Sequence, residues 1–288
     1  MKKSNKKENL DLSHQLLLKE RFLKLNANIS DFSFANLYLF RHLHHYEVII
    51  DEEIYIQGKA RDGTPFLMLT SFPPSNALSN ILALSGSDKI LFPVLENWLP
   101  FFENFPFIIT YKNEESDYLF KKDKLAFFPG RHLSKKRNLV KQFFSLHRVE
   151  TKLLKEEQYQ EGLKVLNDWQ NGHTLKPEET DYFPCKEALE NLSILALEAK
   201  IVYVDGIPSG LLIGERLNQN CYVIHFTKGN KSIKGLYQFL YQDCAQSLAA
   251  NFEWINLEQD LGSPDLHQAK HSYLPDKMVN KFRLAIPT

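Results

Sequence analysis

The chain has few cysteines, no long apolar runs and no excess of charge of either sign. Its three cysteines, Cys185, Cys221 and Cys244, lie far apart and form no C-x-x-C pair. That spacing argues against a disulfide framework and favours a reducing compartment. The longest apolar stretches, such as 66–69 and 105–109, are far shorter than the ~20 residues of a membrane-spanning helix. The lysine-rich start lacks the apolar run of a signal peptide. We therefore expect a soluble, cytoplasmic protein with no transmembrane segment.

What the sequence does contain is the composition of an ordinary globular protein. Of its 288 residues 43% are hydrophobic and 24% charged, and Lys+Arg and Asp+Glu both number 35. This balance excludes a disordered chain, a collagen-like fibre and a disulfide mini-protein. The length allows one large domain or two smaller ones. Residues 1–10 are expected to form a mobile tail.

The hydrophobic pattern predicts a mixed α+β chain in which the second half repeats the element order of the first. In the first half we expect helices at 12–26 and 31–46, strands at 47–50, 54–59 and 65–70, a helix at 88–104, strands at 106–111 and 117–120, and a basic helix at 131–145. In the second half we expect helices at 151–171 and 185–199, strands at 201–204, 209–214 and 221–228, a helix at 235–250, a strand at 254–258, a short helix at 263–272 and a strand at 278–286.

Two Asp-Gly pairs, Asp62-Gly63 and Asp205-Gly206, fall at corresponding places and are typical of hairpin turns. We therefore expect two similar α+β domains, at 11–150 and 151–288; the alternative is one α+β domain with coincidental order. The element order is also that of the acetyltransferase (GNAT-type) fold. In that fold two central strands separate, and a helix N-terminus faces the phosphates of an acyl carrier.

A dense basic segment runs through residues 121–148. It contains nine Lys and Arg residues and one acid, a net charge of +8: Lys121, Lys122, Lys124, Arg131, Lys135, Lys136, Arg137, Lys141 and Arg148, against Asp123. One interpretation is a surface that binds phosphate from nucleic acid, an anionic lipid head group or a nucleotide. The other is an ordinary solvated helix face.

Between an expected strand and helix lies the loop Gly229-Asn-Lys-Ser-Ile-Lys-Gly235. Its glycines could let backbone N–H groups approach a phosphate, and Lys231 and Lys234 would add charge. The loop is neither a P-loop nor a G-x-G-x-x-G motif. An ordinary strand-to-helix turn is the alternative.

Carboxylates follow the expected strand at 254–258, in the segment Asn256-Leu-Glu258-Gln-Asp260-Leu-Gly262. Carboxylates at strand ends are suited to acid/base work and to binding amines. Alternatively, Asp260 caps the next helix and Glu258 faces solvent. Lys270, on that helix, could hold an anion or carry a proton if it were desolvated.

The histidines and cysteines do not form a recognisable metal motif. His42, His44 and His45 share a helix without the H-E-x-x-H pattern, and the cysteines do not complete a zinc set. His225, on an apolar strand, has the setting of a hydrogen-bonded core histidine. No serine stands in a G-x-S-x-G elbow.

Several segments together resemble the C-terminal catalytic domain of the phosphatidylglycerol lysyltransferase family, over about residues 15–285. The specific block is Asn256-x-Glu258-x-Asp260-Leu261-Gly262 with Leu266, Ala269-Lys270, Ser272-Tyr273 and Pro275. Also similar are 117–120, 125–130, Lys135-Lys136-Arg137-Asn138 and Phe143. Weaker matches are Phe34, Asn36-Leu37, Arg41, His225-x-x-Lys228 and Gly235-x-Tyr237.

The resemblance implies a tandem acetyltransferase-like fold and transfer of an aminoacyl or acyl group to a hydroxyl or amine. The chain would be a stand-alone member, without the membrane domain of its membrane-bound relatives. The acceptor would attack the donor carbonyl directly, and no cofactor would be required. Aminoacyl-tRNA or CoA is the candidate donor, and the candidate partners are tRNA and an anionic lipid head group.

The resemblance also implies roles for individual residues. Glu258 or Asp260 would bind the donor's ammonium group or assist the nucleophile, and Lys270 would stabilise the oxyanion or contact phosphate. The expected substrate-binding residues are Lys136, Arg137, Asn138, His225, Lys228, Lys231, Lys234, Asn256 and Tyr273. We expect Glu258, Asp260 and Lys270 to form one partly buried cluster, in which Lys270 or Lys228 is the cation. At least one of Lys135, Lys136 and Arg137 should present its side chain to the same cleft as the 256–275 motif.

Two positions depart from the family pattern, which has glutamate where this chain has Thr227 and arginine where it has His267. The pyrophosphate loop of acetyltransferases is also incomplete, so acetyl-CoA is not supported as donor. Two alternatives therefore stay open. One is a catalytically decayed module that binds tRNA, other RNA or an anionic lipid surface. The other is a CoA-dependent N-acetyltransferase.

Overall fold

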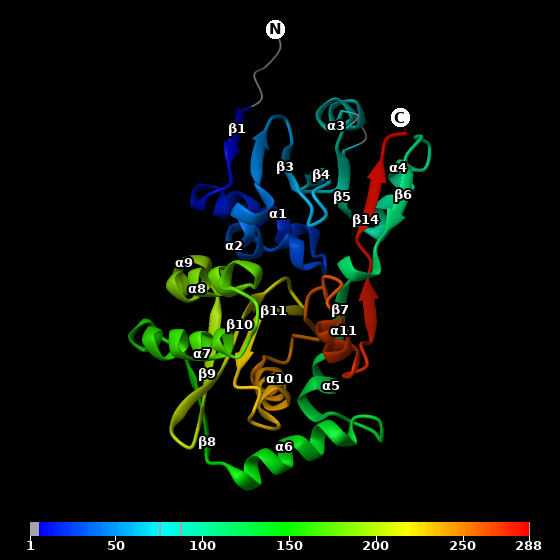
Figure 1. Cartoon of the computed structure of the whole chain (residues 1–288). Helices are drawn as coiled ribbons and strands as arrows, with labels where there is room; N and C mark the ends of the chain where they lie inside the picture. The colour runs from blue at the N-terminus through cyan, green and yellow to red at the C-terminus, as the bar shows by residue number, and fades with distance from the viewer. Residues whose placement is uncertain (1–5, 75, 87, 288) are drawn as a thin grey trace. The chain divides into compact units, whose positions relative to one another are not determined.

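The computed structural model describes residues 6–74, 76–86 and 88–287, which form two seven-stranded mixed sheets with helices packed on them (Figure 1). In order across the first sheet, the strands are β1 (Lys6–Asn9), β2 (Glu47–Ile50), β3 (Ile54–Lys59), β4 (Pro65–Leu69), β5 (Ile90–Val94), β14 (Phe282–Ala285) and β6 (Ile108–Tyr111). The helices in the same part of the chain are α1 (Gln15–Leu25), α2 (Phe34–His44), α3 (Leu78–Ser85) and α4 (Leu99–Phe102).

The second sheet has the order β13 (Lys277–Val279), β7 (Asp117–Lys121), β12 (Trp254–Asn256), β11 (Cys221–Gly229), β10 (Ile207–Arg216), β9 (Glu198–Val204) and β8 (Val149–Leu153). The remaining helices are α5 (Lys122–Phe127), α6 (Ser134–Leu146), α7 (Tyr159–Asn171), α8 (Tyr182–Glu190), α9 (Leu192–Leu195), α10 (Leu236–Ser247) and α11 (Pro264–His271). Helices α7 and α10 both pack against β10 and β11.

The two sheets have the same topology over their first six positions. Each begins with four antiparallel strands, β1 to β4 in one and β8 to β11 in the other. A parallel pair follows, β4–β5 or β11–β12, and then an antiparallel strand, β14 or β7. This confirms the expected fold class: two tandem acetyltransferase-like domains, each a mixed sheet flanked by helices.

The strand that completes each sheet comes from an unexpected part of the chain. Strand β7 follows β6 in the sequence but lies in the second sheet, and β14 follows β13 but lies in the first. The chain accordingly divides into two compact units. The first contains the residues up to Asp117, with Gln259–His267 and the residues from Met278 on; the second contains Tyr118–Glu258 and Gln268–Lys277.

This division does not coincide with the expected boundary near residue 150. The basic helix α6 belongs to the second unit, and the C-terminal strand β14 to the first. Local sequence pattern shows which segments are strands, but strand pairing is decided by contacts between residues far apart in the chain.

Four local expectations were wrong. Residues 88–104 contain β5 and then α4, because the run Ile90-Leu-Phe-Pro-Val94 is a buried central strand, and a short apolar run does not distinguish strand from helix. Strand β8 precedes α7 where one helix was expected, and α3 was missed. The single strand expected at 278–286 is divided into two strands, β13 and β14. Residues 6–9 of the expected mobile tail pair with β2; residues 1–5 lie outside the described part.

Both Asp-Gly pairs form the expected turns. Gly63 and Gly206 adopt a φ of 82°, which favours glycine, and Asp205 also has a positive φ of 54°. They join β3 to β4 and β9 to β10. These turns set the register of the hairpins in both sheets.

The core of the second unit lies between the sheet and the helices α5, α6 and α10. Phe143 of α6 and Phe239 and Leu240 of α10 are buried there together with Val202 and Ile224 of the sheet. One face of α6 is therefore apolar and buried, whereas Lys135 and Lys141 of the same helix are exposed. The exposed basic side chains of α6 therefore lie on the solvent side of a helix that packs against α10.

Candidate active site

The central strands of the second sheet stop pairing before β11 ends. Strands β11 and β12 pair in parallel over Cys221–Val223 and Trp254–Asn256, whereas β11 continues to Gly229. In acetyltransferase-like folds this divergence opens the substrate crevice. Side chains on β11 after Val223, and those that follow Asn256, are therefore candidates for contact with substrate.

A β-bulge places His225 at this divergence. On β11, Phe226 pairs with Ile213 and Ile224 pairs with Gly214, so that His225 is the extra residue between them. Bulges redirect a side chain and are frequent next to active sites. In the first sheet β4 pairs with β3 without a break, and the residues that follow its parallel pairing, Met68 and Leu69, are buried and apolar. The histidine site is thus a feature of the second unit.

His225 lies between two glutamates. Its Nδ1 is 2.7 Å from Glu258 Oε1 and its Nε2 is 3.2 Å from Glu215 Oε1. The side chain of His225 is 1% exposed and that of Glu215 7%, whereas Glu258 is 17% exposed. Glu258 is therefore the residue of this row that is accessible to a ligand.

The imidazole of His225 is charged at neutral pH. Burial lowers the pKa of His225, but the hydrogen bonds to Glu215 and Glu258 and the charges of both outweigh it and raise the pKa to about 9. The imidazolium then donates from both nitrogens, one to each carboxylate. Carboxylates on both sides of this imidazolium make the row acidic in composition, which suits contact with a cationic group such as an ammonium.

The backbone at Glu258 is held in a left-handed conformation, with φ of 58°. Its N–H donates to Asn256 Oδ1 at 2.5 Å, and its carbonyl accepts from the N–H of Tyr118 at 3.2 Å. Asn256 is completely buried. Asn256 thus stabilises the backbone conformation of Glu258. The binding of substrate by Asn256 stays a prediction.

Asp260 organises the turn that precedes α11. It is 2% exposed; its Oδ1 accepts from the N–H of Gly262 at 2.9 Å, and its Oδ2 lies 2.8 Å from Nδ1 of His267. Its carbonyl accepts from the N–H of Ser263. These contacts hold the turn before α11, whereas the first helical N–H groups are accepted by Ser263, whose Oγ lies 3.5 Å from the N–H of Leu266. His267 pairs with Asp260 where the family pattern has arginine.

Lys228 is not the cation of the glutamate row. Its Nζ donates to both carboxylate oxygens of Asp181, at 2.6 and 2.7 Å, and lies 3.7 Å from the centroid of the Trp169 ring. The expectation that Lys228 compensates Glu258 or Asp260 is therefore wrong. Its buried ammonium instead ties β11 to α7 and α8.

Lys270 lies 5.7 Å from the ring centroid of Tyr118, measured from its Nζ. Tyr118 is 1% exposed. The convergence of Lys270 with Glu258 and Asp260 stays a prediction.

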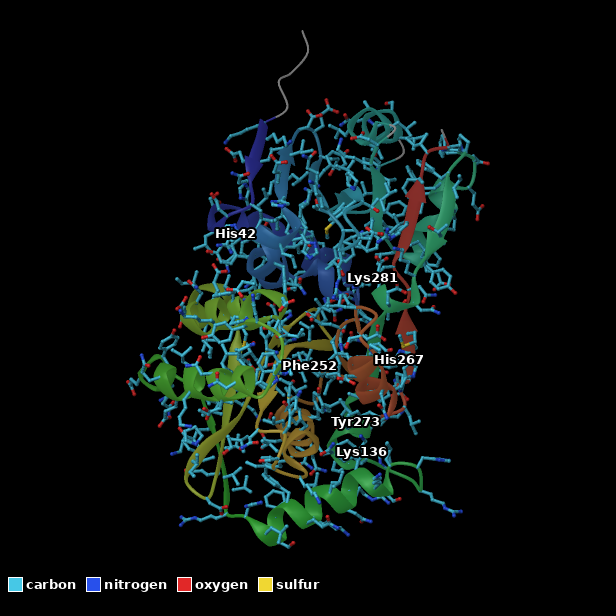
Figure 2. The ribbon with its side chains drawn as sticks, viewed as in Figure 1. His42, Lys136, Phe252, His267, Tyr273 and Lys281 are labelled. Atoms are coloured by element: carbon cyan, nitrogen blue, oxygen red, sulfur yellow. The ribbon has the colours of Figure 1, made fainter. Side chains whose placement is uncertain are left out.

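Lys136 of the basic helix contacts the 256–275 motif, while a cleft shared with that motif stays a prediction. Its Nζ donates to Ser272 Oγ at 2.6 Å and lies 4.0 Å from the Tyr273 ring centroid, and Figure 2 shows Lys136 beside Tyr273. Burial and neighbouring Lys135 lower the pKa of Lys136. Tyr273 is buried, and its hydroxyl accepts from Gln238 at 3.2 Å. The buried ring of Tyr273 thus packs against the ammonium group of Lys136.

The neighbouring residues of the basic helix differ in their contacts. Arg137 donates to the carbonyls of Phe128 and of Gly130, the latter at 2.7 Å, and so closes the loop before α6. Asn138 is exposed. Lys231 and Lys234 are exposed in the loop before α10, which begins after Gly235. Phosphate binding by these residues stays a prediction.

Three residues of the site were missed from the sequence: Glu215, Asp181 and Trp169. Glu215 had a detectable signal, because it and His225 are ionisable residues on adjacent apolar strands of one hairpin. Asp181 and Trp169 had none, since their relation to Lys228 arises from the packing of α7 and α8 on the sheet.

The described residues offer neither a metal site nor a membrane span. No group of three or more His, Cys, Asp or Glu side chains in that part of the chain is placed to hold a metal ion. None of its helices combines the length and hydrophobicity needed to cross a bilayer.

Comparisons with known proteins agree with the fold. The chain is similar to a conserved protein of unknown function from Bacteroides thetaiotaomicron, with 22% identity, a TM-score of 0.89, and coverage of 99% of this chain and 100% of that one. It is also similar to the C-terminal domain of a putative lysylphosphatidylglycerol synthetase from Agrobacterium fabrum, with 12% identity, a TM-score of 0.65 and coverage of 96% and 92%. L-PGS from Bacillus licheniformis is similar too, with 11% identity, a TM-score of 0.62, and coverage of 96% of this chain and 92% of that one. No curated protein matches.

The family model described as phosphatidylglycerol lysyltransferase, C-terminal, matches residues 22–285. The chain has two acetyltransferase-like domains, and a buried histidine between two glutamates lies where the central strands of one domain diverge. It belongs to the phosphatidylglycerol lysyltransferase C-terminal family.

Proposed function

We propose that the chain is an aminoacyl or acyl transferase whose reaction takes place where β11 and β12 diverge. The observation that carries this proposal is the row Glu215–His225–Glu258. Its two carboxylates, its position at a β-bulge and the partial exposure of Glu258 fit a site for a substrate that carries an ammonium group.

In this proposal the acceptor's amine or hydroxyl attacks the donor carbonyl directly. A bond forms between the acceptor atom and the carbonyl carbon, and the donor's ester bond breaks. Glu258 takes the proton that the acceptor loses and returns it to the leaving oxygen. The imidazolium of His225, which is itself held by Glu215, holds the carboxylate of Glu258 in place. A donor ammonium next to Glu258 would orient the carbonyl.

The donor proposed is an aminoacyl-tRNA, because the second unit has exposed cations along α6 and before α10. Lys135, Lys141, Lys231 and Lys234 are exposed, and such side chains neutralise phosphates. The acceptor proposed is a hydroxyl or amine compound, including the head group of an anionic lipid. Asp260 and Lys270, in the block that matches the family pattern, are proposed to contact substrate.

The test is transfer of a labelled amino acid from a panel of aminoacyl-tRNAs to phosphatidylglycerol vesicles and to soluble amines and alcohols. With a donor and acceptor found, Glu258→Gln should lower the transfer rate by about 100-fold or more, which is the usual contribution of a positioned acid or base. Glu253→Gln is the matched control, because Glu253 is an exposed glutamate of the same unit paired with Lys121. Equal loss in both variants, or no loss with Glu258→Gln, would contradict the assignment.

The alternatives give different results in the same preparation. A decayed binding module would bind tRNA, with an affinity that falls steeply with salt, and would transfer nothing from any donor. A CoA-dependent acetyltransferase would be stabilised by CoA, by about 2.7 kcal/mol at 100 times the dissociation constant. We expect salt-dependent tRNA binding, transfer, and no stabilisation by CoA.

A further inference from the structure

The first unit contains a buried lysine, Lys281, that is 1% exposed (Figure 2). Its Nζ lies 2.5 Å from Asp31 Oδ2 and 2.7 Å from Asp117 Oδ1, and it donates to the side-chain carbonyl of Gln259. Asp117 is completely buried, and its second oxygen accepts from the N–H of Ser30 at 2.6 Å. We call Lys281, Asp31, Asp117 and Gln259 the Lys281 cluster.

Two members of the Lys281 cluster stand where the chain passes from one unit to the other. Asp117 is the last residue of the first unit before Tyr118, which begins the second. Gln259 is the first residue after Glu258, where the chain returns. Tyr118 and Glu258 are themselves joined by a backbone hydrogen bond of 3.2 Å. The cluster therefore contains a residue from each of two segments, at the end of 6–117 and at the start of 259–267.

The charges of the cluster do not require Gln259. Burial lowers the pKa of Lys281, but the charges of Asp117 and Asp31 and their hydrogen bonds outweigh it and raise the pKa above its ordinary value. The two carboxylates thus already keep the ammonium charged. The neutral amide of Gln259 adds a link to the segment that carries Glu258 on one side and Asp260 on the other.

We propose that Lys281 is a positioning residue: through Gln259 it fixes the segment 258–260 and so keeps Glu258 in contact with His225. The proposal relies on the proposed function only in calling Glu258 a residue of the reaction site. The contact it concerns, between the Glu258 carboxylate and the His225 imidazole, is measurable without any transfer reaction.

The experiment is titration of His225 by NMR in the full chain labelled with ¹³C,¹⁵N-histidine, with the resonance assigned from a His225→Gln variant. Gln259→Leu removes the link to Lys281 and leaves the ion pairs with Asp31 and Asp117. It should lower the pKa of His225 by about 1 unit, since a weaker contact with Glu258 favours the neutral imidazole. Gln259→Glu, which keeps an oxygen acceptor for Lys281, should restore the pKa.

The matched control is Gln57→Leu, which removes the hydrogen bond from Gln57 to Glu47 in the same unit, away from residues 258–260. It should leave the pKa of His225 unchanged. An unchanged pKa with Gln259→Leu, or an equal fall with Gln57→Leu, overturns the proposal. Should the leucine variant not fold, Gln259→Ala takes its place with the same outcomes. If the panel of donors fails but Gln259→Leu shifts the pKa, the proposed function is wrong and the positioning role holds.

Discussion

At the scale of single residues, the second unit combines groups that are costly to bury. His225 and Glu215 are nearly inaccessible, and each is compensated by a neighbour of opposite charge. Lys228 is likewise buried against Asp181 and Trp169. Buried ionic groups of this kind contribute little net stability. Their concentration around the end of β11 therefore favours a functional interpretation.

The raised pKa of His225 predicts a pH dependence of stability. Because the pKa is about 9 in the folded chain and 6.5 for an unperturbed histidine, the stabilisation is complete below pH 6.5 and is lost as the pH rises through 9. Urea unfolding at pH 6.5 and 9.5 should show a loss on the order of 3 kcal/mol. The variant His225→Gln should show a much smaller loss. The exposed pair of His147 with Asp205 supplies the control, and His147→Gln should keep the dependence of the native chain.

Asp260→Asn distinguishes a role in catalysis from a role in holding the turn before α11. The asparagine keeps one oxygen for the N–H of Gly262, so we expect a loss of about 1 kcal/mol in unfolding free energy and a folded chain. If Asp260 contacts substrate, transfer should be abolished. Circular dichroism and the transfer assay measure both effects, with Asp265→Asn in the following helix, α11, as control. A folded and fully active Asp260→Asn variant would contradict the catalytic role.

At the scale of elements, the site depends on how α6 and α10 approach one another. Gly235 precedes α10 with a φ of 91°, and a Cβ atom there would lie 2.5 Å from the carbonyl oxygen of Leu139 in α6. Such a contact cannot be relieved by side-chain rotation. The glycine of this loop is thus explained by packing and does not require a phosphate ligand.

Gly235→Ala should therefore destabilise the chain by about 3 kcal/mol or more, since backbone strain and steric overlap add. Gly206→Ala is the control, because Gly206 has a φ of 82° but nothing lies within 4 Å of the position of its Cβ. It should cost only the conformational penalty of about 1–2 kcal/mol. Chemical unfolding measures both, and equal costs would contradict the packing explanation.

At the scale of the whole molecule, each of the two units is built from segments that are far apart in the sequence. The first sheet is completed by β14 from the C-terminal end, and the second by β7 from the first half. The stability of the first unit should therefore depend on residues that are far away in the sequence.

Leu284→Ala tests this dependence, because Leu284 of β14 is completely buried between β5 and β6. The cavity should cost about 2–5 kcal/mol. Hydrogen exchange should become faster in peptides that contain β5 and β6. Leu212→Ala in β10 is the matched control and should accelerate exchange in β9 and β11 instead. If Leu284→Ala left β5 and β6 protected, the strand assignment would be wrong.

The sequence by itself determined the fold class and the order of most elements. The Asp-Gly turns, the apolar strands and the amphipathic basic helix are local patterns, and each follows from residues close together in the chain. The family block at 256–275 directed attention to Glu258 and Asp260. The contact of Lys136 with Ser272 and Tyr273 is more specific than the expectation that one of three basic residues faces the cleft of this block.

Tertiary structure alone decided which residues meet. The exchange of β7 and β14, the bulge at His225, its pairing with Glu215 and the attachment of Lys228 to Asp181 all join residues from separate elements. Hydrophobic periodicity records which side of an element is buried, but it carries no information on its partner. Buried charges must find a compensating group wherever the fold brings one. For that reason the partners of His225, Lys228 and Lys281 were decided by packing rather than by local sequence.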